Sequence, residues 1–262
     1  MPGRFDPLAP SGSSALLTDH YELTMLQASL ADGTARRRCV FEVFARSLPP
    51  GRRYGVVAGT GRVLDALEAF HFTGDQLDWL ADADVVDDAT LAYLADYRFT
   101  GSVTGYGEGD CYFPQSPVLT VEAPFGEAVV LETLLLTILN HDSAVASAAS
   151  RMTLAAAGRP CIEMGSRRTH EAAAVAAARA AYVAGFTSTS NLEAGHRYAI
   201  PTRGTSAHAF TLVHGSETGA FASQLAALGT GTTLLVDTYD VAEGVRRAVQ
   251  AAGPQLGAVR LD

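Results

Sequence analysis

Residues 161–191 read CIEMGSRRTHEAAAVAAARAAYVAGFTSTSN. Cys161–Met164 is a short apolar run that predicts a strand, His170–Ala184 predicts a helix, and Gly185–Thr187 predicts a second strand. A strand, a helix and a strand at this spacing favour two parallel strands joined by a crossover helix. In such folds ligands bind at the carboxyl ends of the strands. We therefore expect an α/β fold whose chemistry lies in the residues that follow each strand.

The same alternation continues to the end of the chain. It predicts strands at Ala207–Leu212, Leu234–Asp237 and Val259–Asp262, and a helix at Val241–Ala252. A closed eight-stranded barrel takes about 200 residues or more, and fewer than that follow Gly158. We therefore expect an incomplete α/β barrel, in a chain that is truncated at its C-terminus or completed by another chain.

The N-terminal half has a different character. Thr18 or Asp19 is placed to cap a helix with Leu23, Leu26 and Leu30 on its buried face. Two or three short helices are predicted between residues 59 and 97, and a small antiparallel sheet between residues 99 and 122. Arg38–Phe44 predicts a strand that ends at the turn Pro49-Pro50-Gly51, and the short helices offer as buried residues Leu64, Leu67, Phe70, Leu77, Trp79, Leu80, Leu91, Leu94 and Tyr97. We expect a loose N-terminus at residues 1–14, an α+β domain at 15–125 and the incomplete barrel at 126–262.

Composition excludes several classes of partner. A net charge of -9 and a pI near 5.2 argue against nucleic acid and anionic membranes, which need a concentrated basic face. The apolar run at residues 128–139 has the length of a core helix, and residues 1–14 lack the layout of a signal peptide. The three cysteines form neither a CxxC pair nor a disulfide framework, so we expect a cytoplasmic protein.

The arginine pair Arg167-Arg168 follows the first predicted strand of the repeating region. A guanidinium fork can hold a carboxylate or a phosphate through two hydrogen bonds, so the pair is a candidate anion site in an otherwise acidic chain. The alternative is a solvated arginine beside a structural salt bridge, and spacing alone leaves both interpretations open.

His208 lies between small residues inside a predicted strand. A histidine in such a place is commonly a satisfied core or loop residue. The other interpretation is chemical: imidazole is mostly neutral near pH 7, and one nitrogen can attack a phosphoryl group when the other is held by a neighbour. Both interpretations stay open on local pattern alone.

Five further positions carry groups that suit a chemical or a structural role. Asp237 and Asp262 stand at predicted strand ends, where a carboxylate can bind ribose hydroxyls or a magnesium-coordinated diphosphate. Asp240 has the same options, but a helix N-cap is its default role. Tyr21 can stack on an aromatic ligand or pack on the core, and Glu108, between two glycines, is interpreted as a turn residue. No Walker loop, dinucleotide fingerprint or HExxH pair identifies a metal or cofactor site.

Six segments together resemble the nicotinate phosphoribosyltransferase family in order and spacing. They are Thr18–Met25 (TDHYELTM), Phe41–Arg46 (FEVFAR), Glu163–Arg168 (EMGSRR), Thr187–Asn191 (TSTSN), Gly204–His208 (GTSAH) and Val236–Asp240 (VDTYD). The resemblance implies a phosphoribosyltransferase-type irregular α/β barrel with an N-terminal α+β domain. Members of the family continue beyond a segment like Arg260–Asp262 with further strands and a glycine-containing phosphate-binding loop.

The resemblance also implies an activity. Nicotinate and 5-phosphoribosyl 1-diphosphate would give nicotinate mononucleotide and diphosphate in NAD salvage, coupled to ATP hydrolysis and assisted by Mg²⁺. By the same analogy His208 is transiently phosphorylated by ATP and Tyr21 stacks on the pyridine ring. Arg167 or Arg168 would hold a carboxylate or phosphate, and Thr205, Asp237 and Asp262 would lie near the phosphoribosyl substrate. A homodimer is expected, because relatives commonly place the tyrosine matching Tyr21 in the site of the neighbouring subunit.

Two alternatives remain open from the sequence. The chain is an inactive truncated fragment or an interaction protein if the missing strands leave sheet edges and apolar surface exposed. A second alternative keeps the fold and changes the base to nicotinamide or quinolinate, and a base-competition assay would separate these substrates.

Overall fold

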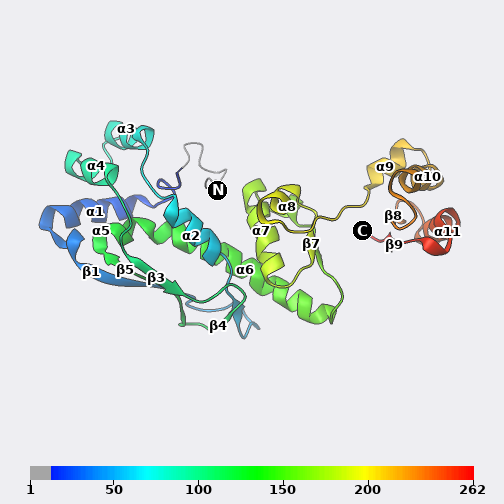
Figure 1. Ribbon diagram of the computed structural model, residues 1–262, viewed down its shortest axis with the longest axis horizontal. Helices are drawn as coiled ribbons and strands as arrows, with labels where there is room; N and C mark the ends of the chain where they lie inside the picture. Colours follow the sequence, from blue (N-terminus) through cyan, green and yellow to red (C-terminus); the bar gives the residue numbers. More distant parts are fainter. Residues whose placement is uncertain (1–12) are drawn as a thin grey trace. The chain divides into compact units, whose positions relative to one another are not determined.

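The computed structural model describes residues 13–262, and the contacts divide the chain into two compact units. The first unit ends at Thr202 and the second spans Arg203–Asp262; each is described by itself (Figure 1). The loose segment predicted for residues 1–14 lies outside the described residues as far as residue 12, whereas Ser13 and Ser14 are buried. The domain boundary predicted after residue 125 falls inside the first unit and stays a prediction.

The first unit begins with a helix and a three-stranded antiparallel sheet. The strand order is β1-β5-β3, with Phe41 of β1 opposite Val121 of β5. Helix α1 begins directly after Asp19 and buries Leu23 and Leu26, so the predicted helix, strand and antiparallel sheet are confirmed. These elements are α1 (His20–Asp32), η1 (Thr34–Arg36), β1 (Arg38–Phe44), β3 (Ser102–Gly105) and β5 (Pro117–Pro124).

Three short helices lie between β1 and β3, as the sequence predicts. They begin with local caps: the Thr73 and Gln76 side chains form a capping box at α3, and the Asp87 carboxylate accepts from the Thr90 amide at α4. A two-stranded antiparallel pair flanks them. The helices and strands are β2 (Gly55–Val56), α2 (Thr60–Glu68), α3 (Gly74–Asp82), α4 (Asp88–Ala95) and β4 (Cys111–Tyr112).

Two residues that we expected in the core of these helices are exposed. Leu64 and Trp79 expose 48% and 56% of their surface, and each adjoins a residue that does point inward, Val63 and Leu80. Because successive residues of a helix point about 100° apart, only one of two neighbours can face the core fully. The other expected residues are buried or packed against the core: Leu67, Phe70, Leu77, Leu91, Leu94 and Tyr97.

The long helix α6 (Glu132–Ala156) is the central element of the first unit. It follows α5 (Phe125–Ala128) and η2 (Val129–Leu131). The run Phe125–Ala156 is long and apolar enough to cross a membrane, but 56% of its most apolar window is buried inside the unit, as in a core helix. Leu135 and Ile138 belong to the main core with α1 and β5, whereas Ala146 packs near Val56 and Ala180.

A parallel strand pair closes the first unit. Strands β6 (Ile162–Glu163) and β7 (Ser188–Thr189) are joined by α7 (Glu171–Val183), so the predicted crossover is confirmed. The second strand forms at Ser188–Thr189 rather than at Gly185–Thr187. Gly185 has φ +97°, and its amide donates to the Tyr182 carbonyl at 3.0 Å, so this residue terminates α7 and cannot begin the strand. Helix α8 (Leu192–Tyr198), capped by the Asn191 side chain, was not predicted.

The second unit has a second parallel pair, with Leu234 of β8 opposite Val259 of β9. Its core is formed by Phe221, Leu234, Val236 and Ala248. The strand predicted at Ala207–Leu212 is wrong, because His208–Val213 forms a helix; an apolar run this short does not distinguish the two. Helix α10 was also not predicted. The elements are α9 (His208–Val213), α10 (Glu217–Leu228), β8 (Thr233–Leu235), α11 (Val241–Ala252), η4 (Gly253–Gln255) and β9 (Ala258–Arg260).

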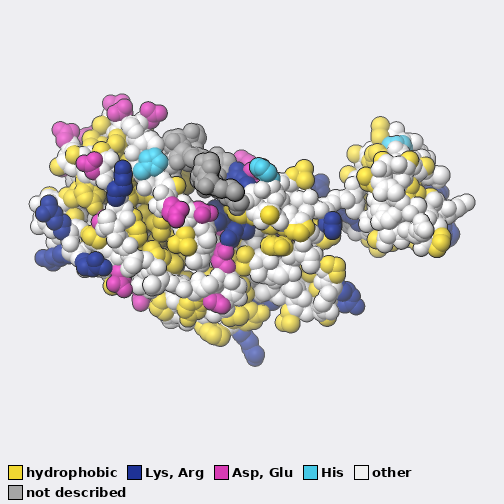
Figure 2. Space-filling view, viewed as in Figure 1, with side chains coloured by type: hydrophobic (Ala, Val, Ile, Leu, Met, Phe, Trp, Pro, Cys, Tyr) yellow, Lys and Arg dark blue, Asp and Glu magenta, His cyan; other side chains and the backbone are white. Residues whose placement is uncertain are grey.

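Negative side chains gather on α3, on α4 and on the loop between them (Figure 2). All of these carboxylates are exposed: Asp75, Asp78, Asp82, Asp84, Asp87 and Asp88. Much of the net negative charge therefore lies on this face of the first unit, far along the chain from the predicted site residues.

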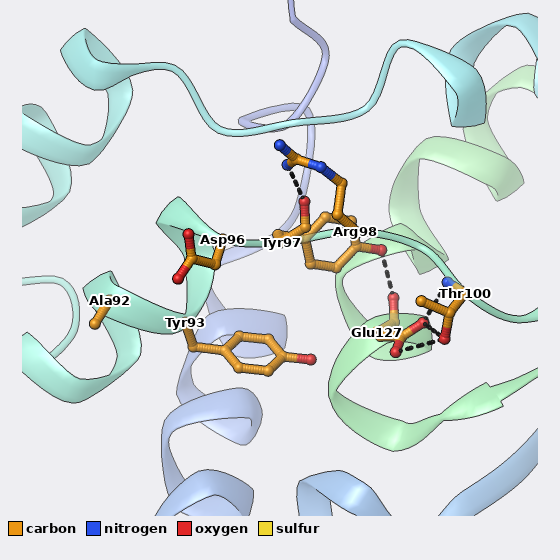
Figure 3. A pocket seen from close by; sticks show the side chains of 7 residues that line it. All are labelled: Ala92, Tyr93, Asp96, Tyr97, Arg98, Thr100 and Glu127. Carbon is orange, nitrogen blue, oxygen red and sulfur yellow. Dashed lines mark hydrogen bonds between the residues drawn. The ribbon is translucent and has the colours of Figure 1, made fainter.

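A cavity of about 360 Å³ lies beside α4 in the first unit (Figure 3). The Tyr97 hydroxyl donates to the Glu127 carbonyl at 2.7 Å, and the Glu127 carboxylate accepts from the Thr100 amide at 2.6 Å. These bonds hold the segment between α4 and β3 against α5. The remaining lining residues are Ala92, Tyr93, Asp96 and Arg98, so none of the predicted site residues lines the cavity.

Glu108 connects distant parts of the first unit. It lies in the turn between β3 and β4, as predicted, and its carboxylate accepts two bonds from the Arg179 guanidinium at 2.6 and 2.7 Å. The amide of Gly59, which caps α2 with φ +99°, donates to the same carboxylate at 2.6 Å. Burial by itself would raise the pKa of Glu108, but the bonds from Arg179 and from Gly59 lower it below its ordinary value.

We predict that Glu108→Gln lowers the free energy of unfolding of the first unit by about 2 kcal/mol at pH 7, because it leaves a half-buried guanidinium without its partner charge. Since the folded-state pKa of Glu108 is depressed, this stabilisation is present above the unfolded pKa and is lost as the pH falls through the folded pKa. Urea unfolding at pH 7 and pH 3 measures both effects. Glu193→Gln, at an exposed pair with Arg197, is the control; equal losses in the two variants would contradict the prediction.

Candidate active site

The carboxyl ends of β8 and β9 place two carboxylates at one edge of the second unit. Asp237 follows β8 after the buried Val236, and Asp262 follows β9. Helix α11 begins a few residues after β8, at Val241. The Asp240 side chain caps this helix by accepting from the Glu243 amide at 2.8 Å. The default role expected of Asp240 is therefore confirmed.

Helix α11 lies directly against the end of β8. A β-carbon at Gly244 would approach the Val236 carbonyl oxygen to 2.1 Å, so only glycine permits this contact. The close approach fixes the backbone that leads into Asp237. Packing of α11 thus helps to set where the first carboxylate points.

His208 is the first residue of α9, and its imidazole meets the two strand ends. Its Nδ1 lies 3.2 Å from the Thr238 hydroxyl. Its Nε2 lies 3.6 Å from Asp262 Oδ2 and 3.9 Å from Asp237 Oδ1. The side chain is 40% exposed; one ring nitrogen is held by Thr238, and the other lies beside two carboxylates.

The two aspartates are themselves connected. The backbone amide of Asp262 donates to Asp237 Oδ2 at 2.7 Å. The other oxygen, Asp237 Oδ1, is buried and has no hydrogen-bond partner within residues 13–262. A buried carboxylate oxygen without a donor is costly in a folded protein. It is the oxygen of this site that is most suited to accept a ligand donor or a cation.

Arg260 ties the segment before α9 to the strand ends. One guanidinium nitrogen donates to the Thr205 hydroxyl at 2.9 Å and to the Ser206 carbonyl at 3.2 Å, and the other donates to Asp262 at 2.6 Å. Thr238 was expected among the residues of interest after a predicted strand, whereas Arg260 was not predicted as a site residue. Both stand at the carboxyl ends of predicted parallel strands, and that position was the available signal.

The other predicted site residues belong to the first unit. Tyr21 on α1 is 47% exposed, and partial burial together with the carboxylates of Glu132 and Glu22 raises the pKa of its phenol. Arg167 and Arg168 form the exposed turn η3 (Ser166–Arg168) after β6, and neither makes an ion pair with another described residue. His208, Thr205, Asp237 and Asp262 therefore lie together in the second unit. Tyr21, Arg167 and Arg168 belong to the first unit.

Glu22 is a residue that the sequence reasoning missed. It is fully buried next to Tyr21 and accepts from the Thr133 amide, in the first turn of α6, at 2.9 Å. Burial raises the pKa of Glu22, and bonds from the Thr133 and Thr18 hydroxyls partly offset that rise. The bond from α1 to α6 fixes the turn on which Tyr21 is presented. The separation of Glu22 and Thr133 in the sequence left no local signal for it.

Comparison with known proteins identifies the family and the fold. The family model described as the nicotinate phosphoribosyltransferase (NAPRTase) N-terminal domain matches residues 16–140. A nicotinate phosphoribosyltransferase of Mycobacterium tuberculosis is 60% identical over 99% of this chain, and one of Bacillus subtilis is 38% identical over 92%. The chain spans 59% and 49% of the lengths of these two relatives.

Two solved structures share the fold. Human nicotinic acid phosphoribosyltransferase is 27% identical with a TM-score of 0.82, over 94% of this chain and 61% of that one. A nicotinate-nucleotide pyrophosphorylase from Pyrococcus furiosus is 26% identical with a TM-score of 0.79, over 95% of this chain and 57% of that one. The fold is therefore of the phosphoribosyltransferase α/β type, and the described residues contain no closed barrel.

We predict that Arg260→Met speeds tryptic cleavage after Arg203 about tenfold, because the variant loses hydrogen bonds that hold Thr205 and Ser206 to the strand end. The control is Arg246→Met, on the exposed face of α11, which should leave that rate unchanged. Mass spectrometry of the early fragments reads out the site of cleavage, and cleavage after Arg247 reports any general loosening of the unit. Equal rates after Arg203 in both variants would show that Arg260 does not order this segment.

Proposed function

The chain belongs to the nicotinate phosphoribosyltransferase family, and we propose that the protein transfers the phosphoribosyl group of 5-phosphoribosyl 1-diphosphate to nicotinate. The products are nicotinate mononucleotide and diphosphate, and hydrolysis of ATP to ADP and phosphate is coupled to the transfer. The place of this reaction is the salvage of nicotinate for NAD synthesis.

The observation that carries the proposal is the environment of His208. Thr238 holds Nδ1, and Nε2 faces the carboxylates of Asp262 and Asp237. When Nδ1 carries the proton, Nε2 has a free lone pair and is a nucleophile near neutral pH. In the proposed step Nε2 attacks the γ-phosphorus of ATP, the phosphorus–nitrogen bond forms, and ADP departs. Water later breaks that bond and releases phosphate.

We propose magnesium as the cation for the same group of residues. A phosphate that approaches Nε2 comes next to the carboxylates of Asp237 and Asp262, which would repel it without a cation. Carboxylate oxygens are preferred ligands of Mg²⁺, and Asp237 Oδ1 is buried without a hydrogen-bond donor. Asp237 and Asp262 would hold the ion, which supplies positive charge to the phosphates of ATP and of the phosphoribosyl substrate.

The transfer itself requires no removal of a proton from the nucleophile. The pyridine nitrogen of nicotinate is already a nucleophile, so the protein must align it with the anomeric carbon and stabilise the departing diphosphate. All 19 basic side chains of the chain are arginines, so every fixed cation offered to a substrate is a guanidinium. We assign the nicotinate carboxylate to Arg167 or Arg168 and the face of the pyridine ring to Tyr21.

The expected homodimer and cytoplasmic location belong to this proposal and stay predictions.

Nicotinate is the proposed base because its carboxylate matches a guanidinium fork, which the neutral amide of nicotinamide does not. A competition assay with nicotinate, nicotinamide and quinolinate decides between them.

We predict that His208→Ala removes the acid-labile phosphate that γ-labelled ATP leaves on the protein and abolishes the ATP hydrolysis that is coupled to transfer. The matched control is His214→Ala, in the residue that follows the same helix, where the ring bonds only to the Phe210 carbonyl in the described structure. Phosphate labelling and mononucleotide formation are measured together. Labelling that survives in the His208 variant would take the phosphate-accepting role from this residue, and a parent protein that forms no mononucleotide would overturn the proposed function.

Replacing Arg167 or Arg168 with alanine should raise the KM for nicotinate about tenfold to a hundredfold, since each charge-assisted bond contributes about 1.5–3 kcal/mol. Turnover of nicotinamide, where it occurs, should change little, because that base has no carboxylate. Arg159→Ala, at an exposed arginine shortly before β6, serves as the control. If both arginine variants keep the parent KM for nicotinate, the carboxylate is held elsewhere.

A further inference from the structure

A buried carboxylate lies behind the arginine turn of the first unit. Glu163, the last residue of β6, exposes only 9% of its surface. One carboxylate oxygen accepts from the Gly165 amide, and the other accepts from the Thr189 hydroxyl of β7 at 2.6 Å. A buried charge is tolerated where hydrogen bonds satisfy it, and both oxygens here have donors. The carboxylate thus joins the two parallel strands to the first residue of the turn.

The turn itself is shaped around this carboxylate. A β-carbon at Gly165 would lie 2.8 Å from the Glu163 oxygen, so a side chain there would displace it. The Arg168 amide donates to the Gly165 carbonyl at 2.8 Å and closes the turn that carries both arginines. Glutamate and glycine two residues apart are therefore complementary parts of one arrangement, which explains why they occur together in the segment EMGSRR.

The loop after β7 holds the turn from its other side. The Asn191 side-chain amide donates to the Ser166 hydroxyl at 3.0 Å, and the Asn191 backbone amide donates to the Thr189 hydroxyl at 3.0 Å. The Ser190 amide also donates to the Glu163 carbonyl at 2.8 Å. Every one of these bonds ends on the backbone or on a short side chain, so the turn before Arg167 is held in one conformation.

We propose that Glu163 is a positioning residue for substrate binding, which rests on the proposed function and on the anion role of Arg167 and Arg168. The two arginines are exposed and make no ion pair with another described residue, so only the turn beneath them limits where their guanidinium groups can reach. A fixed turn lowers the conformational entropy lost when an anion is bound. Glu163 and Thr189 supply this fixation without touching the substrate.

The role predicts a specific kinetic signature. Glu163→Gln keeps one acceptor for the Gly165 amide, whereas Glu163→Ala removes both acceptors and Thr189→Val removes the second contact with little change of shape. The KM for the anion held by the arginines should rise about tenfold in Glu163→Ala and Thr189→Val, with a smaller rise in Glu163→Gln. The kcat should stay near that of the parent, because binding weakens equally in the ground and transition states. Hydrogen exchange of residues 165–168 should accelerate in the same order.

Thr73→Val is the structural control, since it removes the N-cap of α3 in the same unit and lowers stability away from the turn. A purely structural role for Glu163 would lower the melting temperature in all variants and leave KM at the parent value in each. An active parent whose Glu163 and Thr189 variants keep KM and exchange rates would overturn the positioning role and leave the proposed function standing. A parent that forms no mononucleotide would instead remove the proposed function itself.

Discussion

Parallel pairing of β8 with β9 is the constraint on which the candidate active site depends. Because the two strands run in the same direction, their carboxyl ends reach the same edge, and the Asp262 amide can bond to the Asp237 carboxylate at 2.7 Å. At that edge His208 bonds to Thr238, and Thr205 bonds to Arg260. An antiparallel arrangement would put the two aspartates at opposite ends of the pair, and no local interaction could restore their proximity.

The two parallel pairs use the same geometry for different chemistry. After β6 and β7 a buried glutamate supports exposed guanidinium groups, which suit the binding of an anion. After β8 and β9 two carboxylates flank an imidazole, which suits a cation and a phosphoryl acceptor.

The sequence predicted what depends on local pattern and missed what depends on distant contacts. The alternation of apolar residues predicted β1, α1, α7 and α11 within a few residues, because strands and helices have distinct periods of 2.0 and 3.6 residues. The Asp240 side chain caps α11 as expected, whereas neither Thr18 nor Asp19 caps α1 through its side chain. His208 was assigned to a strand, since a short apolar run fits both periods and only the tertiary environment selects the helix.

Contacts between remote residues were beyond the same reasoning. Glu108 bonds to Arg179, and Glu22 to Thr133, across long stretches of chain that carry no periodic signal. The proximity of Asp237 and Asp262 was predictable because each follows a predicted parallel strand, whereas His208 was placed inside a predicted strand and reaches them from α9. The position of Arg260 at a predicted strand end was a signal in the sequence, but only the structure shows that its guanidinium bonds both to Thr205 and to Asp262.

Helix α6 packs against both parts of the first unit, the antiparallel sheet region and the region of the parallel strand pair. Its N-terminal half is part of the core built on α1 and β5, and its C-terminal half packs against α7 and β2. One continuous series of backbone hydrogen bonds runs through both halves of α6. Unfolding of one half would therefore also weaken the packing of the other half. The antiparallel sheet and the parallel pair are therefore thermodynamically coupled, and the first unit should melt as one cooperative body although it contains two kinds of layer.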